Sequence, residues 1–95
     1  MKKEDFYNTK IHLKSKKESE RVQNLMFDLG FGWTHHMNKS PKFTNVPFLY
    51  FGEDGVITFS DIGDSLYFDM HPSKLITLED LGIVINWKKR LGGMK

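Results

Sequence analysis

Residues 15–30 read SKKESERVQNLMFDLG, and this stretch decides the fold because it holds the start, the buried stripe and the end of one helix. Ser15 and Glu18 have the spacing of a capping box, in which each side chain accepts a hydrogen bond from a free backbone amide. An apolar stripe follows at i, i+3, i+4 and i+7, made by Val22, Leu25, Met26 and Leu29. Gly30 stands where a left-handed C-cap is needed. We therefore predict a helix over residues 16–29.

Short β-strands are predicted on both sides of this helix. Residues 8–14 alternate around Ile11 and Leu13, which is typical of a strand with one buried face. Further strands are expected at residues 31–33, 47–51, 56–60 and 65–70, with a short strand or connector at 74–76. Thr77 is expected to cap a helical turn over residues 77–81.

The expected fold is α+β, with one main helix packed on one face of a mostly antiparallel sheet. The element order is β-α-β-β-β-β, followed by a short C-terminal helical turn. The helix stripe is expected to meet inward-pointing strand residues, namely Ile11, Leu13, Leu49, Phe51, Ile57 and Phe59.

The composition is that of one globular domain. The chain has 95 residues, of which 39% are hydrophobic and 27% charged. We expect an ordered core over residues 8–81 and loose residues 1–7. Residues 82–95 form an ambiguous basic tail, in which residues 83–85 are β-like and Asn86 is placed to cap a short basic helix over residues 87–91.

Two features that the sequence lacks limit the classes of function to consider. There is no cysteine, which excludes disulfides and thiolate zinc sites and fits a reducing cytoplasm. No apolar run approaches the ~20 residues that cross a bilayer, so we expect no membrane partner.

Charge is distributed unevenly along the chain, although the net charge is only +2. Residues 53–80 hold seven acids against one base, Lys74, which gives −6 and leaves +8 for the remainder. Such asymmetry indicates two faces of opposite potential, which would steer the binding of a charged partner.

Three stretches resemble a known group of proteins when they are taken together. The main helix ends in Leu29-Gly30-Phe31-Gly32-Trp33, an aromatic strand follows at residues 46–51, and the third stretch is Ile76-Thr77-Leu78-Glu79-Asp80-Leu81. In order and spacing they resemble small accessory proteins of tailed bacteriophages, over residues 10–81. The resemblance implies a phage origin and a host-directed role in the cytoplasm of an infected bacterium. It carries over no catalytic or ligand residue.

Residue sets that perform catalysis or hold a metal are not visible. His35 and His36 are adjacent, so on a strand they point to opposite faces and do not readily share an ion. There is no cysteine nucleophile and no Gly-x-Ser-x-Gly elbow. Turns and an outer hairpin face explain Asp61, Asp64 and Asp69 better than acid–base catalysis does. We therefore expect no enzyme, no metal and no cofactor.

Lysines crowd the junction between the first strand and the helix, at Lys10, Lys14, Lys16 and Lys17. Lysine is a poor complement to the positive end of the helix dipole. One interpretation is an anion site for phosphate, nucleic acid or an acidic protein face, with Trp33 beside it for a nucleotide. The other is a solubilising edge, which we favour because charge runs are usually solvated.

Most aromatic rings are expected to fill the core, because the acids near these strands would repel the phosphates of stacked bases. Tyr50 and Tyr67 are the best candidates for an exposed protein-binding hot spot. The tail offers further contacts at Trp87, Lys88, Lys89 and Arg90, and its role is open between docking and a packed or disordered terminus.

The favoured hypothesis is a non-enzymatic accessory protein that binds a host protein and alters it by occlusion. Two alternatives stay open. One is sequestration of a small nucleotide signal, and the other is weak nucleic-acid binding through residues 10–17 and 86–91. A homodimer also stays open.

Overall fold

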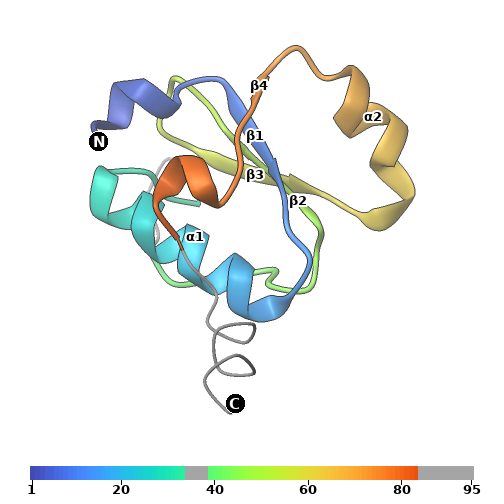
Figure 1. The fold of residues 1–95 in the computed structure, drawn as a ribbon, viewed down its shortest axis with the longest axis horizontal. Helices are drawn as coiled ribbons and strands as arrows, with labels where there is room; N and C mark the ends of the chain where they lie inside the picture. The colour runs from blue at the N-terminus through green and yellow to red at the C-terminus, as the bar shows by residue number, and fades with distance from the viewer. Residues whose placement is uncertain (34–38, 84–95) are drawn as a thin grey trace, which may run out of the picture.

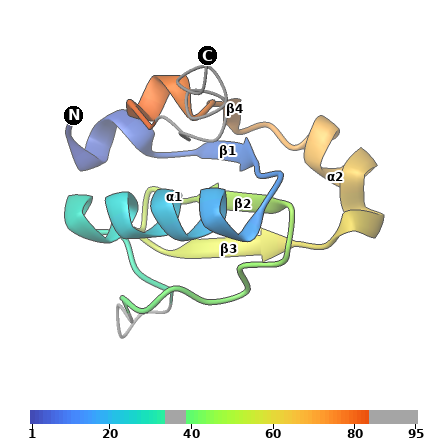
Figure 2. The same ribbon diagram turned by 60° about the horizontal axis from the view of Figure 1, so that its bottom comes forward.

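The computed structural model describes residues 1–33 and 39–83, which form a four-stranded sheet with a helix on either side (Figures 1 and 2). The strands are β1 (Thr9–His12), β2 (Phe48–Phe51), β3 (Ile57–Ser60) and β4 (Lys74–Leu75). The helices are α1 (Lys16–Leu29) and α2 (Ser65–Met70). There are also three short 3-10 turns among the described residues, η1 (Lys3–Phe6), η2 (Ile62–Asp64) and η3 (Glu79–Leu81). The predicted α+β class with one main helix is confirmed.

The sheet has the strand order β3-β2-β1-β4. The β1–β2 and β2–β3 pairs are antiparallel, and β4 is parallel to β1. Ile11 lies opposite Leu49 across the β1–β2 pair, and Lys10 lies opposite Tyr50. Since side chains alternate along a strand, the first pair points to one face of the sheet and the second pair to the other.

Helix α1 begins and ends at the predicted residues. The Ser15 Oγ accepts a hydrogen bond from the Glu18 amide at 3.1 Å, and Glu18 Oε1 accepts one from the Lys14 amide at 2.9 Å. Gly30 has a φ of 111°, which is the left-handed conformation that ends many helices. A Cβ at this position would also lie 3.2 Å from the flexible Lys3 side chain, so the positive φ is the main reason for glycine here.

Helix α1 packs on the first face of the sheet and closes the main core. Val22 and Met26 are fully buried, and Leu25 and Leu29 are half-buried against the same cluster. The strands and the residue after β1 contribute the buried side chains Ile11, Leu13, Leu49, Phe51 and Ile57. Phe59 lies opposite Leu49 and so points to this face as predicted, but on the edge strand β3 it stays 42% exposed.

The predicted hairpin and the closing helical turn are both present. Strands β2 and β3 pair from Phe51 opposite Ile57 to Phe48 opposite Ser60. In the closing turn, the Thr77 amide donates to Asp80 Oδ2 at 2.8 Å and the Asp80 amide donates to Thr77 Oγ1 at 3.3 Å. This reciprocal pair starts η3, as the sequence predicts.

Helix α2 replaces a predicted strand over residues 65–70, so that prediction is wrong. Asp61 Oδ1 accepts a hydrogen bond from the Ile62 amide at 2.8 Å, and Asp64 Oδ2 accepts one from the Asp61 amide at 3.1 Å. These two acids start a helical turn immediately before α2. Phe68 is the buried residue of α2. The alternation of Leu66, Phe68 and Met70 therefore does not correspond to the buried face of a strand.

Two smaller expectations are also corrected. Residues 31–33 do not form a strand and contribute only a bridge between Gly32 and Val56. Residues 3–6 are not loose: they form η1, and Phe6 is buried in the main core. Both corrections extend the core toward the N-terminus and toward the end of α1.

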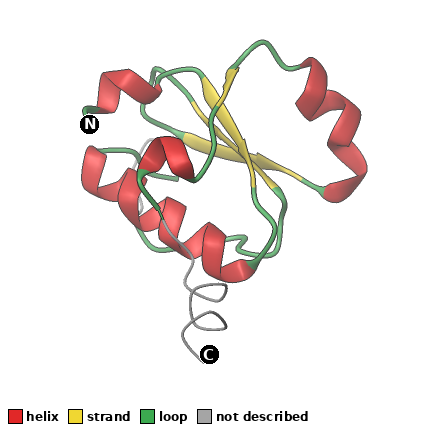
Figure 3. Ribbon diagram, viewed as in Figure 1, coloured by secondary structure: helices red, strands yellow, loops and turns green. Residues whose placement is uncertain are grey.

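Helix α2 covers the second face of the sheet (Figure 3). The Phe68 ring stacks on the Phe48 ring with centroids 4.4 Å apart and planes 19° from parallel. Together with Tyr50 these rings form a small core separate from the main one. Every residue of β2 is buried as a result, because both of its faces are covered.

Candidate functional site

Lys10 is the first of the predicted anion contacts, and the structure gives it a different role. It is 6% exposed, and its ammonium donates to the backbone carbonyls of Phe68, Asp69 (3.3 Å) and His71 (3.0 Å). These carbonyls lie at the C-terminal end of α2, where the helix dipole favours a cation. Lys10 therefore holds α2 and is not free to bind an anion. The prediction failed because strand alternation turns Lys10 to the face that α2 covers.

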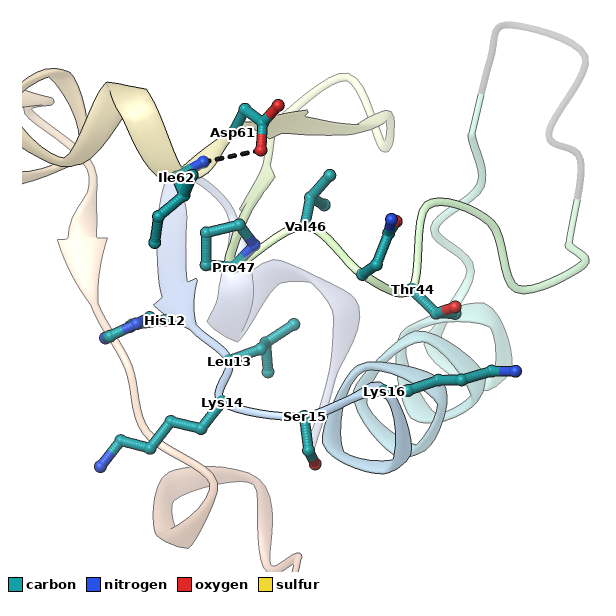
Figure 4. A pocket seen from close by; sticks show the side chains of 11 residues that line it. His12, Leu13, Lys14, Ser15, Lys16, Thr44, Val46, Pro47, Asp61 and Ile62 are labelled. Carbon is teal, nitrogen blue, oxygen red and sulfur yellow. Dashed lines mark hydrogen bonds between the residues drawn. The ribbon is translucent and has the colours of Figure 1, made fainter.

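The other predicted lysines, Lys14, Lys16 and Lys17, are exposed near the start of α1. A pocket of about 440 Å³ lies beside them (Figure 4). Figure 4 shows the Lys14 and Lys16 side chains extending in opposite directions, with Asp61 on the far side of the pocket. Ser15 Oγ is engaged by a backbone amide of the helix. The described lining residues therefore do not converge their positive charges on a single point, as a phosphate site requires.

Trp33 is buried at 6% exposure and lines a different hollow from the one beside the lysines. Its Nε1 donates to Gln23 Oε1 at 3.0 Å. Gln23 is fully buried, donates to Ser19 Oγ and the Lys42 carbonyl, and accepts from the Lys42 amide. This network ties the chain before β2 to α1, so Trp33 has a structural role and the predicted nucleotide grouping is not formed.

Tyr50 and Tyr67 are both expected on an exposed face; their rings are in edge contact, with centroids 5.9 Å apart, but they differ in exposure. Tyr50 is 6% exposed, and its hydroxyl lies 2.6 Å from Ser60 Oγ. Burial raises the pKa of the Tyr50 phenol, and the hydrogen bond to Ser60 offsets part of that rise. The expected exposure of Tyr50 is wrong because α2 covers it. Tyr67 is 57% exposed, and its binding role stays a prediction.

Tyr67 belongs to a larger exposed apolar region, which we call the α2 surface. The α2 surface consists of Leu66, Tyr67 and Met70, which are 70%, 57% and 75% exposed. A hollow of about 620 Å³ lies on it, lined by Leu66, Tyr67, Met70, His71 and Pro72. Soluble proteins usually scatter exposed apolar residues singly, so three on one short helix indicate a contact surface.

Sequence reasoning missed Leu66 and Met70 as surface residues. Ile62, Leu66 and Met70 are four residues apart, and Ile62 is also 70% exposed. This spacing is the helical signal that could have identified them. The alternation of Leu66, Phe68 and Met70 competes with it and favours a strand.

The α2 surface is packed firmly enough to have one orientation. Phe68 anchors α2 by stacking on Phe48, and the Lys10 ammonium lies 4.7 Å from the centroid of the Phe68 ring. The three carbonyls that Lys10 binds come from the last turn of α2 and the residue after it. The exposed side chains therefore project from a helix that is held at one buried ring and at its C-terminal end.

Acidic side chains border the α2 surface. Asp61 and Asp64 precede α2, Asp69 lies within it, and all three are exposed. The positive charge of Lys10 is buried beneath carbonyl oxygens, and Lys74 is exposed on β4. The α2 surface is thus an apolar patch with a mainly negative border, within the acidic region of residues 53–80.

The remaining predicted contacts, Trp87, Lys88, Lys89 and Arg90, lie outside the described residues, so their role stays a prediction. Within residues 1–33 and 39–83, no helix has the length and apolar composition of a membrane span. No group of three or more histidine or acidic side chains in the same ranges could hold a metal ion.

Comparison of the chain with models of protein families, with curated proteins and with solved structures finds no match. The surface chemistry of the described residues is therefore the basis on which a function can be proposed.

Proposed function

We propose that this protein acts by binding a partner protein through the α2 surface, without catalysing a reaction. One observation carries the proposal: Leu66 and Met70 are 70% and 75% exposed on a helix that Lys10 and Phe68 hold in place. Leu66, Tyr67 and Met70 together expose apolar side chains on one short helix, and exposed apolar patches of this kind are often functional.

The charge around the α2 surface favours a protein over the other large partners. Asp61, Asp64 and Asp69 would repel the phosphates of nucleic acid. They would also repel the anionic lipids at a cytoplasmic membrane surface. A protein can bury the apolar side chains and place basic residues against the acids.

The resemblance to accessory proteins of tailed bacteriophages supports a bacterial host protein as the partner. A domain of 95 residues that covers part of a larger protein can block that protein's own contacts. The proposed mode of action is therefore occlusion of a host protein in the cytoplasm of an infected bacterium.

Capture from bacterial lysate tests the proposal with two matched variants. The double variant Leu66→Ser and Met70→Ser removes the apolar anchors without touching the main core. The control variant Lys16→Ala and Lys17→Ala changes exposed lysines near the start of α1. We expect the unmodified chain and the lysine control to retain one host protein. The amount of this protein captured by the serine variant should be at least about tenfold lower.

The captured protein is then purified and its binding to all three chains is measured by calorimetry. Circular dichroism and thermal unfolding establish that the serine variant is folded. Equal capture by the serine variant would contradict the proposal. Loss of capture only in the lysine control would contradict it too, and would place the binding site at the start of α1.

A further inference from the structure

The α2 surface is built from side chains, with little backbone to offer a partner. The carbonyls of Phe68, Asp69 and His71, at the end of α2, already accept from Lys10. The other backbone groups of a helix interior are engaged within the helix. A partner strand that binds by backbone pairing needs free amides and carbonyls at a strand edge. The α2 surface therefore has to be recognised through its side chains.

The spacing of these side chains suits a helix in the partner. Leu66 and Met70 are four residues apart on α2, so their side chains lie on the same side of the helix. Rows of side chains four residues apart form the ridges that fit between the ridges of a second helix. The hollow of about 620 Å³ beside Leu66 and Met70 gives room for one large apolar side chain of that helix.

The charge around the α2 surface favours a foreign partner over a second copy of this chain. A two-fold symmetric contact through α2 would place the same acids, Asp61, Asp64 and Asp69, near their own copies. Like charges at such an interface oppose binding. The buried Lys10 ammonium is saturated by carbonyls and cannot serve as the opposing cation. Basic residues from a different protein satisfy the acids without this repulsion.

We infer that the partner presents a basic amphipathic helix to the α2 surface, with its apolar face on Leu66, Tyr67 and Met70 and its cations near Asp64 and Asp69. This inference rests on the proposed function and specifies the element that the partner contributes. The apolar contact supplies most of the affinity, and the acids set the sign of charge that is accepted.

Selection from a displayed library of random peptides tests the inference without knowledge of the natural partner. Peptides of about 16 residues are long enough for four helical turns. We expect the selected sequences to carry apolar residues at i, i+3 or i+4 and i+7, together with a positive net charge. Chemical-shift mapping with a selected peptide should give its largest changes at residues 66–72.

Binding of a selected peptide is then measured for three chains. Leu66→Ser with Met70→Ser should weaken binding by at least about tenfold. Asp69→Asn should weaken it by roughly two- to fivefold, because an exposed charge pair contributes little, and the loss should shrink at high salt. Asp69 is the preferred acid for this test because Asp61 and Asp64 also cap η2.

Several results would overturn the inference. These are acidic selected sequences, a period of two residues that indicates a strand, no enrichment of any peptide, or binding that Leu66→Ser with Met70→Ser leaves unchanged. Self-association of this chain through Leu66 and Met70 would overturn it as well. The lysate experiment stays independent, because capture that depends on Leu66 and Met70 supports the proposed function whatever element the partner uses.

Discussion

The two helices cover opposite faces of one sheet, but they use their side chains in opposite ways. Helix α1 buries five residues, and two of its apolar side chains, Val22 and Met26, have no exposure at all. Helix α2 buries Phe68 and leaves Leu66, Tyr67 and Met70 more than half exposed. The α1 face supplies the main core, while the α2 face supplies a surface that is available for contact.

This division explains how a small domain can carry an exposed apolar patch. Stability comes from the area that is removed from water, most of which lies between α1 and the sheet. Helix α2 needs only enough contact to hold its orientation, and it gains this from Phe68 and Lys10. Elements that bind partners are commonly drawn from the less stable parts of a structure.

The largest effect on the free energy of unfolding is expected when methionine is replaced by alanine, in separate variants, on each of the two helices. Met26→Ala removes a fully buried side chain and should lower the free energy of unfolding by about 2–5 kcal/mol. Met70→Ala removes a side chain that is 75% exposed and should change it by no more than about 0.5 kcal/mol. Urea unfolding of the two variants measures the contrast. Similar losses in both would mean that α2 contributes to the core as much as α1 does.

The same division decides how much of the fold the sequence could predict. The ends of α1 are set by Ser15, Glu18 and Gly30, which act on neighbouring backbone and are visible locally. The end of α2 depends on Lys10, which is 58 residues away from Phe68 in the chain. Such a contact has no local signal, and the alternation of Leu66, Phe68 and Met70 competes with the four-residue spacing that favours a helix. The prediction of a strand followed the alternation.

The candidate site was predictable only in part, for a related reason. Strand alternation places Lys10 and Tyr50 on the face opposite α1, but it cannot show that α2 covers that face. Both were therefore expected to be exposed. Tyr67 was predicted to be exposed, and it is, because it lies on the outer side of α2. The local sequence does not indicate that Gln23 links α1 to the chain before β2, since its partners Trp33 and Lys42 are ten or more residues away.

A smaller effect is expected from two lysines that flank the end of β1. Lys10→Met removes the ammonium that binds three carbonyls and should lower the free energy of unfolding by about 1–3 kcal/mol. Lys14→Met changes an exposed side chain and should have almost no effect. The Cα chemical shifts of residues 65–70 should move toward coil values only in the first variant.

The lysine comparison also tests how α2 is held. Shifts of residues 65–70 that stay helical in Lys10→Met would show that Phe68 alone is sufficient to hold α2. In that case the free energy of unfolding should fall by less than the stated range. Shifts of residues in α1 provide the internal reference, because α1 packs on the other face of the sheet.

The smallest effect is a dependence of the free energy of unfolding on alkaline pH, which arises from Tyr50 in the small core under α2. Burial raises the pKa of the folded Tyr50 phenol above the ordinary value of 10.0, so the folded chain holds this proton more tightly than the unfolded chain. The Tyr50 contribution to the free energy of unfolding is constant below pH 10. It falls as the pH rises from 10 toward the raised pKa, because the unfolded chain loses the proton first.

Tyr50→Phe should therefore flatten the loss of stability above pH 10. At neutral pH, Tyr50→Phe also loses the hydrogen bond to Ser60, which contributes roughly 0.5–1.5 kcal/mol. Urea unfolding at pH 7, 9.5 and 10.5 separates these two effects. An unchanged alkaline slope in Tyr50→Phe would mean that the phenol is solvated in the folded chain and that α2 does not close over this face of the sheet.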